Sequence, residues 1–344
     1  MILLHRRSVL CGLAASALPF SARAQNAAIT DGAGRTVAIP PKVARVLPAG
    51  PPAAILLYTL APDLLAGWPR SPRPNERTFL SPDIANRPEI GRITGRGNTA
   101  NLEVVVQMKP DLILDAGATT QTFVSMADRV QEQTGVPYAL LDGRIELAAD
   151  TYRTLGKLLH SETEAELLAR ESEAILRMVR ERIAKVPNDK RPRVYYARGP
   201  RGLETGLAGS INVESIEIMG AHNVASGQRG GLTSVSLEQV LAWNPEVIVT
   251  IEEGFADAVR SDPNWAAVSA VKTGRVHLAP KLPFGWIDFP PSVNRLIGLP
   301  WLGKIFYPEI FPQDLKITAR AFYSKFYHVE MSDMQLDGIL AGRS

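Results

Sequence analysis

Two short segments of this chain, residues 101–114 and 236–249, repeat one pattern and constrain the fold more than any other feature. They read NLEVVVQMKPDLIL and SLEQVLAWNPEVIV, and without gaps they share leucine, glutamate, valine, proline and isoleucine at matching positions. In each copy a capping residue precedes a short helix with an acid in its first turn. Proline then blocks the helix, and a β-branched apolar run follows as a buried strand. The repeat predicts two α/β lobes of similar plan.

The strongest helix signal lies between the two copies, at residues 161–187. Ser161-Glu162-Thr163-Glu164 fits a capping box, and no glycine or proline follows until Pro187. About 25 helical residues would span roughly 37 Å, enough to run along two stacked lobes. A rigid rod of this kind predicts only small closure of the lobes. One apolar stripe at helical spacing supports the helix: Leu168, Ile175, Val179, Ile183 and Val186.

The flanking regions alternate strand and helix signals, which predicts parallel sheets covered by helices. We expect an α/β fold: two Rossmann-like lobes with parallel sheets, bridged by a single long α-helix, with the ligand crevice at the carboxyl ends of the strands. The N-terminal lobe, residues 25–160, has expected strands at 43–47, 65–68, 112–114 and 138–141, and helices at 53–60, 101–108, 120–134 and 147–159. The C-terminal lobe, residues 188–344, has expected strands at 193–197, 247–251 and 276–278, helices at 212–219 and 237–243, and returning helices at its end.

Residues 1–24 are typical of an export signal peptide of the twin-arginine type. Arg6-Arg7 precede an apolar run at 9–20, and Ala22-Arg23-Ala24 supplies a small-residue cleavage site. The run is shorter than the roughly 20 residues that span a bilayer. An ordinary Sec signal stays open as an alternative. Either route predicts a soluble protein of the bacterial periplasm.

The composition excludes several classes of function. Apolar residues make up 45% and charged residues 21% of the chain, as in ordinary soluble globular proteins. Lys and Arg number 38 against 35 acids, and three of the arginines lie in the signal peptide, so the mature chain is close to neutral. We therefore expect no nucleic-acid partner. The only cysteine, Cys11, lies in the same signal segment, which leaves the mature chain without a thiol.

Several segments, in this order and spacing, resemble the periplasmic substrate-binding proteins of ABC importers for iron–siderophore complexes, haem and vitamin B12. The resemblance covers nearly the whole mature chain and implies the class III periplasmic-binding-protein fold. It implies capture of a solute between the lobes and delivery to an inner-membrane ABC permease, without enzymatic activity or a resident cofactor. We expect a monomer. The segments that carry the resemblance are 31–40 (DGAGRTVAIP), 45–46, 101–103, 109–113, 156–159, 220–225 and 235–239.

The resemblance also implies two permease-docking residues. In this family one glutamate of each lobe contacts arginines of the permease, and the matching positions are Glu103 and Glu238. Two acids at equivalent places in two lobes suit a two-point electrostatic contact that guides encounter and register. The alternative is that each acid only stabilises the start of its own helix, by about 0.3–1 kcal/mol.

The crevice is expected between the loops 48–52, 92–98, 116–119, 198–205 and 284–288. Arginines beside an aromatic residue suit an anionic, partly aromatic ligand, since guanidinium binds oxyanions and stacks on rings. A ferric siderophore fits best, while haem, cobalamin and an oxyanion such as molybdate stay open. Each arginine could instead be a solvated loop charge, and the residues of the 286–295 run could serve packing and capping. The candidate ligand-binding residues are Arg92, Arg96, Arg198, Arg201, Trp286, Asp288 and Arg295.

Other kinds of site find little support in the sequence. The mature histidines His160, His222, His277 and His328 have no metal-site spacing, so we expect no directly bound metal ion. No Gly-x-Ser-x-Gly, Walker A or His-Glu-x-x-His motif is present. Two alternatives of another class remain, namely a periplasmic ligand sensor or accessory module and an uncharacterised enzyme.

Overall fold

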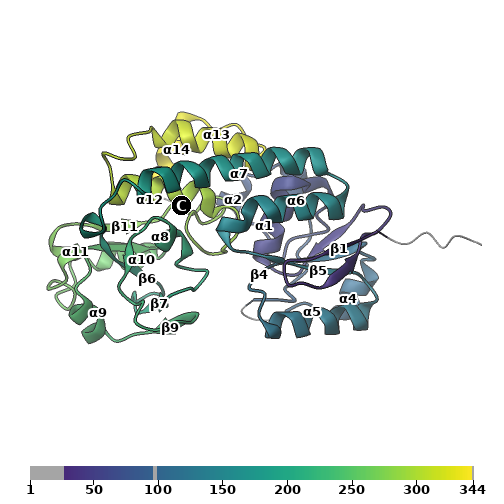
Figure 1. The fold of residues 1–344 in the computed structure, drawn as a ribbon, viewed down its shortest axis with the longest axis horizontal. Coiled ribbons are helices and arrows are strands. Elements are labelled where there is room, and N and C mark those ends of the chain that lie inside the picture. The colour runs from purple at the N-terminus through teal and green to yellow at the C-terminus, as the bar shows by residue number, and fades with distance from the viewer. Residues whose placement is uncertain (1–26, 96–98, 343–344) are drawn as a thin grey trace, which may run out of the picture.

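Two parallel sheets form the centres of two lobes, as the repeat predicts (Figure 1). The computed structural model describes residues 27–95 and 99–342. The fold class is confirmed: an α/β protein whose two lobes carry parallel sheets and share one long helix. The first sheet has the order β3 (Val46–Pro48), β4 (Leu112–Gly117), β5 (Tyr138–Asp142). The second has the order β11 (Val276–Leu278), β10 (Val247–Thr250), β6 (Arg193–Ala197), β8 (His222–Asn223).

The repeated segments fold as the sequence predicts. In the N-terminal lobe α4 (Leu102–Gln107) leads into β4, and in the C-terminal lobe α9 (Leu237–Trp243) leads into β10. The Asn101 side chain accepts a hydrogen bond from the Glu103 amide at 2.9 Å, and Ser236 accepts one from the Gln239 amide at 3.3 Å. Each capping residue therefore satisfies a backbone donor that the first helical turn would leave unpaired.

The long helix α7 (Glu162–Ile183) runs along both lobes on one side of the molecule (Figure 1). It packs against α6 (Ala148–Leu159), α1 (Pro51–Leu60) and α12 (Arg295–Phe306). The predicted stripe is buried at Leu168, Val179 and Ile183. Because one helix contacts elements of both lobes, it fixes how they face each other.

The predicted capping box at Ser161 is wrong. The Ser161 hydroxyl accepts no cap hydrogen bond within the described part of the chain and instead donates to the Leu159 carbonyl at 3.4 Å. The preceding helix ends at His160 in the left-handed conformation, with φ 55°, so the chain turns directly from α6 into α7. Gly156 permits this close turn, since a Cβ there would lie 2.5 Å from the Ala165 Cβ.

Two other expectations differ from the structure. Residues 65–68 form isolated bridges, Leu65 to Val46 and Trp68 to Glu89, instead of a strand, because the two ends pair with different segments. The helix expected at 212–219 is shorter, α8 (Glu214–Ile218), since Ser210 and Asn212 form a side-chain-stabilised turn before it.

The smaller elements complete the two lobes. Around the first sheet lie β1 (Ala28–Thr30), β2 (Thr36–Ala38), η1 (Pro62–Leu64), α2 (Pro74–Arg77), α3 (Pro82–Ala85), α5 (Gln121–Thr134) and η2 (Ile145–Leu147). Around the second lie η3 (Asn188–Lys190), β7 (Glu204–Gly206), β9 (Leu232–Ser234), α10 (Glu253–Ala258) and α11 (Ser269–Lys272).

The C-terminal helices return over the long helix (Figure 1). These are α13 (Leu315–Tyr327) and α14 (Asp333–Leu340), which follow α12. The Tyr58 hydroxyl of α1 donates to the Tyr327 carbonyl at 2.8 Å, so the end of the chain packs on the first lobe. Within residues 27–95 and 99–342, no helix combines the length and the apolar character needed to cross a membrane.

Candidate functional site

A cavity of about 280 Å³ lies between the lobes, at the carboxyl ends of β3, β4 and β6. Open α/β sheets bind ligands at this edge, and the alternation of strands and helices in the sequence predicted the crevice here. The lining comes from Pro51-Pro52, Arg92, Thr94, Gly95, residues 115–118, Phe123, Arg198, residues 211–212, Leu232 and residues 288–291.

One wall is organised by Asp288, whose carboxylate has no exposed surface. It forms an ion pair with Arg198 and accepts hydrogen bonds from the Tyr196 hydroxyl and the Asn212 amide, both at 2.8 Å. Burial, together with the neighbouring Asp288 carboxylate, raises the pKa of Tyr196 well above its usual value, so this hydroxyl stays a donor. The Asp288 carboxylate, oriented by Tyr196 and Asn212, holds Arg198 at the cavity wall and balances its charge.

The opposite wall contains a second buried carboxylate, Asp115, in the last half of β4. It accepts hydrogen bonds from the Thr94 hydroxyl at 3.0 Å, the Ala116 amide at 2.9 Å and the Tyr138 hydroxyl at 3.0 Å. Burial raises the pKa of Asp115 above its usual value, although these three donors favour the charged form. The bond to Thr94 fixes the loop that also supplies Arg92 and Gly95 to the cavity.

Apolar side chains form much of the remaining wall. Helix α1 begins with Pro51 and Pro52, and both line the cavity. Phe289 also lines it, is 66% exposed and has φ 58°. A bulky residue with positive φ is uncommon, so neighbouring contacts must hold it there. Those contacts are the buried Asp288 on one side and the hydrogen bond from the Ser292 hydroxyl to the Pro52 carbonyl, 2.8 Å, on the other.

Three of the sequence-predicted ligand residues, Arg92, Arg198 and Asp288, are brought together at the cavity. Their role in binding stays a prediction. Arg201 lies exposed in the turn after β6 and is not part of the cavity lining. Arg96 falls outside the described residues.

The structure places Trp286 and Arg295 in the core instead of on the cavity wall. Neither side chain has exposed surface. The Trp286 indole donates to the Tyr323 hydroxyl at 3.1 Å, and Arg295 donates to backbone carbonyls and to Glu214. Of this run, only residues 288–291 line the cavity.

Sequence reasoning missed Asp115, Asn212 and Phe289. Asp115 at the end of a strand was a usable signal, because strand ends line the crevice in this fold class. Phe289 carried no such signal, since its position depends on contacts made far along the chain.

No cluster of three or more His, Cys, Asp or Glu side chains that could hold a metal ion occurs among the described residues. Burial, followed by the charges of Arg275 and Arg260, lowers the pKa of His277 to about 4. His277 is thus neutral at neutral pH.

Glu103 and Glu238 occupy equivalent exposed positions in the first turns of α4 and α9. These helices lie one in each lobe, on the side away from α7 (Figure 1). Hydrogen bonds from the Ser236 side chain and the backbone amide lower the pKa of Glu238, which keeps it charged. Val104 and Val106, which follow Glu103 on α4, are 44% and 45% exposed. Docking through these acids stays a prediction.

Comparison with known proteins identifies similar chains. Residues 88–282 match the family described as "Periplasmic binding protein". The Molybdate-binding protein MolA of Haemophilus influenzae is 26% identical, over 93% of this chain and 96% of that protein. The Fe(3+)-citrate-binding protein YfmC of Bacillus subtilis is 23% identical, over 53% of this chain and 58% of that protein. The solved ABC transporter solute binding protein of Sulfurospirillum deleyianum has a TM-score of 0.83 and 27% identity, covering 91% of this chain and 99% of that one.

Proposed function

Since this chain belongs to the periplasmic binding protein family, we propose that its solute is a small ferric chelate, held as cargo in the cavity between the lobes. The protein is the periplasmic solute-binding component of an ABC importer and works with a membrane permease. It is a binding protein, not an enzyme.

The apolar lining of the cavity is the observation that carries this choice of ligand. Pro51, Pro52, Phe289 and Pro290 face a space of about 280 Å³. A tetrahedral oxyanion, with four oxygens each about the size of a water molecule, would fill only about half of that volume or less. A chelate brings both carbon groups, which suit the prolines and the phenylalanine, and anionic oxygens, which suit arginine.

The start of α1 favours the same choice. Helix N-termini bind bare anions mainly through the amide hydrogens of their first residues. Here the first two residues, Pro51 and Pro52, carry no amide hydrogen. The helix therefore presents its positive end to the cavity but few hydrogen-bond donors. For lack of these donors, a ligand with apolar groups loses less binding free energy than a bare oxyanion does.

Charge balance in the cavity supports an anion of low charge. The positive charge of Arg198 is paired with Asp288, and Arg92 comes from the same loop as Thr94, which donates to the buried Asp115. Two arginines and two aspartates therefore leave little net charge to stabilise a dianion without further donors.

Molybdate is the second candidate. It is supported by the similarity to the molybdate-binding relative, which extends over 93% of this chain. On this alternative, Arg92, Arg198 and the Asn212 amide would supply the donors around the oxyanion.

Binding measurements on the purified mature chain test the proposal. Titration calorimetry with a ferric hydroxamate siderophore, ferric citrate, haem, cobalamin and molybdate, together with visible spectra, gives the affinities. We expect saturable binding of a ferric chelate with a charge-transfer band. Tight binding of molybdate without binding of either ferric chelate would overturn the proposal in favour of the second candidate.

We propose that Glu103 and Glu238 dock the protein on the permease and that the protein acts as a monomer. The equivalent positions of the two acids in α4 and α9, their exposure, and the placement of these two helices on the side away from α7 support this contact. Two charges, one on each lobe, fix the orientation of the protein on the permease and also guide its approach. We also propose that residues 1–24 direct export by the twin-arginine route.

A further inference from the structure

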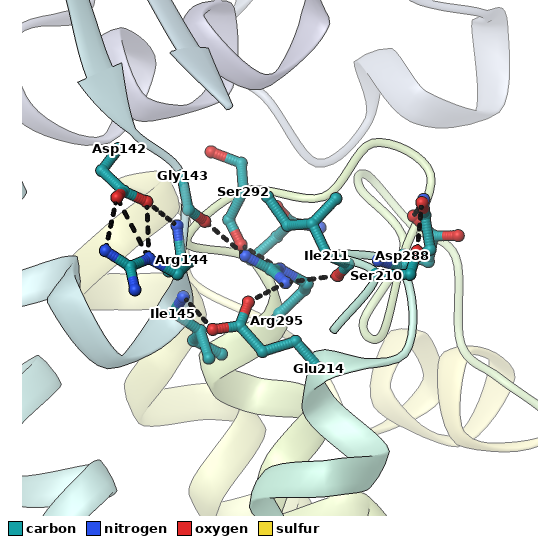
Figure 2. A network of polar contacts seen from close by, with 12 residues as sticks. Asp142, Gly143, Arg144, Ile145, Ser210, Ile211, Glu214, Asp288, Ser292 and Arg295 are labelled. Atoms are coloured by element: carbon teal, nitrogen blue, oxygen red, sulfur yellow. Dashed lines mark hydrogen bonds and ion pairs between the residues drawn. The ribbon is translucent and has the colours of Figure 1, made fainter. Parts of the chain in front are cut away.

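The side chain of Arg295, at the start of α12, is fully buried and uses most of its donors (Figure 2). Its Nε donates to the Ser292 carbonyl at 3.1 Å. One terminal nitrogen donates to the Ile211 carbonyl at 2.8 Å and to Glu214 at 2.7 Å, and the other donates to the Gly143 carbonyl at 2.6 Å. One residue thus connects four separate points of the backbone and side chains.

These contacts join the two lobes. Gly143 follows β5 in the N-terminal lobe, whereas Ile211 and Glu214 lie before and in α8 of the C-terminal lobe. The second oxygen of the Glu214 carboxylate accepts a hydrogen bond from the Ile145 amide at 3.0 Å, which adds another contact to the N-terminal lobe. Figure 2 shows Arg295 and Glu214 between these two segments.

Both sides of this connection continue to the ligand cavity. On one side, the Gly143 amide donates to the Gly117 carbonyl at 2.8 Å, and Gly117 lines the cavity. On the other, Ile211 lines the cavity, and the next residue, Asn212, donates to Asp288 at 2.8 Å. Hydrogen bonds therefore lead from Arg295 to both cavity walls.

Gly143 is packed tightly against segments of both walls. A Cβ on Gly143 would lie 2.7 Å from the Gly117 Cα and 3.2 Å from an Ile211 side-chain carbon. Segments of the two walls are therefore in close contact beside Arg295.

We propose that Arg295, held by Glu214, is a positioning residue that sets the separation of the two cavity walls without touching the solute. The proposal rests on the cavity being the ligand site. Only arginine suits this position, because its planar group offers five fixed donors, whereas lysine offers a compact ammonium with three. A buried ion pair of this kind loses much of its attraction to desolvation, so its main contribution here is geometric.

Distance measurements between the lobes test this directly. Because the only cysteine, Cys11, lies in the signal segment, the mature chain can carry spin labels at Gln133→Cys in α5 and Lys272→Cys in α11. Both positions are exposed, one in each lobe. Pulsed electron resonance then reports the distribution of lobe separations without any ligand. We expect a narrow distribution for the labelled protein and a broader or shifted one in Arg295→Lys.

A matched control is Arg35→Lys. Arg35 is likewise largely buried, and it donates to the Tyr138 carbonyl at 2.8 Å and to Asp128 at 2.8 Å, both within the N-terminal lobe. This variant should leave the distribution unchanged. If Arg295→Lys does not fold, Glu214→Gln replaces it, because a glutamine oxygen cannot serve both the Ile145 amide and Arg295 as the carboxylate does.

Binding provides the second readout, with ferric hydroxamate and molybdate as the probes. Arg295→Lys should lower the affinity for the probe that the wild-type protein binds by about tenfold, a cost of about 1.4 kcal/mol. A folded Arg295→Lys or Glu214→Gln with the wild-type distance distribution overturns the inference, whether or not affinity falls. If the wild-type protein binds neither probe, the proposed ligands fail, while the distances still decide the role of Arg295.

Discussion

The guanidinium of Arg193 donates a hydrogen bond to the Trp243 carbonyl, 2.5 Å away, at the end of α9. In the other lobe Arg45 makes the same contact with the Met108 carbonyl at 2.6 Å, at the end of α4. The acids of the repeat match as well: Glu246 accepts from the Arg193 amide at 3.0 Å, and Asp111 accepts from the Arg45 amide at 2.9 Å. The sequence repeat is therefore also a repeat of hydrogen bonds.

Removing one of these acids should destabilise its lobe. The Asp111 carboxylate accepts two strand amides, from Ala44 at 2.7 Å and from Arg45 at 2.9 Å. Asp111→Ala leaves both without this partner, so we expect the free energy of unfolding to fall by about 1–3 kcal/mol. Urea denaturation measures the change. Asp257→Ala, an exposed acid of α10, is the control, and equal stabilities of both variants would contradict the prediction.

Replacing both docking acids should separate transport from binding. In Glu103→Ala plus Glu238→Ala, uptake should be lost because the permease contact is gone, while solute affinity should stay unchanged because neither acid lines the cavity. Uptake assays in cells and calorimetry on the purified protein measure the two effects. The exposed acids Glu132 and Glu309, changed together to alanine, form the control pair. Normal uptake by the first double variant would refute the docking role.

Phe289 should discriminate between the two classes of solute. Its exposed ring at the cavity can contact the carbon groups of a chelate but offers nothing to an oxyanion. Phe289→Ala should therefore weaken ferric hydroxamate binding by about tenfold, the scale of one lost apolar contact, and leave any molybdate binding unchanged. Calorimetry measures both. Ile317→Ala, at an equally exposed site on α13, should change neither. Unaltered ferric affinity in Phe289→Ala would count against the apolar wall as a contact surface.

His277 should make the protein less stable in acid. Burial lowers its pKa in the folded state to about 4, whereas an unfolded chain has the ordinary value of about 6.5. Between these values the unfolded state binds more protons, so stability falls as the pH drops from about 6.5 to about 4. We expect this residue to account for about 2–3 kcal/mol of that loss.

Urea denaturation at neutral pH and at about pH 4.5 checks the role of His277. The His277→Gln variant should show a smaller loss of stability over this interval than the wild-type protein does. An identical loss in both proteins would mean that other groups carry the acid sensitivity.

Local sequence patterns predicted most of the fold because periodicity and capping act within a few residues. The repeat, the long helix and both central sheets were foreseen in this way. The capping box at Ser161 failed, although its residue pattern was correct, because the left-handed residue His160 leaves the serine in the wrong conformation to cap. Whether a capping residue caps thus depends on how the chain enters the helix.

The site was predictable only in outline. Strand ends pointed to Arg198 and, through the same loops, to Arg92, but no local pattern separates a buried arginine from an exposed one. Arg295 is buried because carbonyls from both lobes, including that of Gly143, surround it. Trp286 faces the core because the Tyr323 hydroxyl, on a helix formed later in the chain, accepts its indole hydrogen.

The packing of α13 and the segment after it on α1 also has a consequence for synthesis. The Tyr58 side chain is buried against the Phe284, Tyr327 and His328 segments, and its hydroxyl bonds to the Tyr327 carbonyl. When a ribosome has made only the first half of the protein, these partners do not yet exist. The apolar surface of α1 around Tyr58 therefore stays uncovered until the end of the chain has been synthesised. The first lobe can therefore complete its packing only after the C-terminal segment has been made.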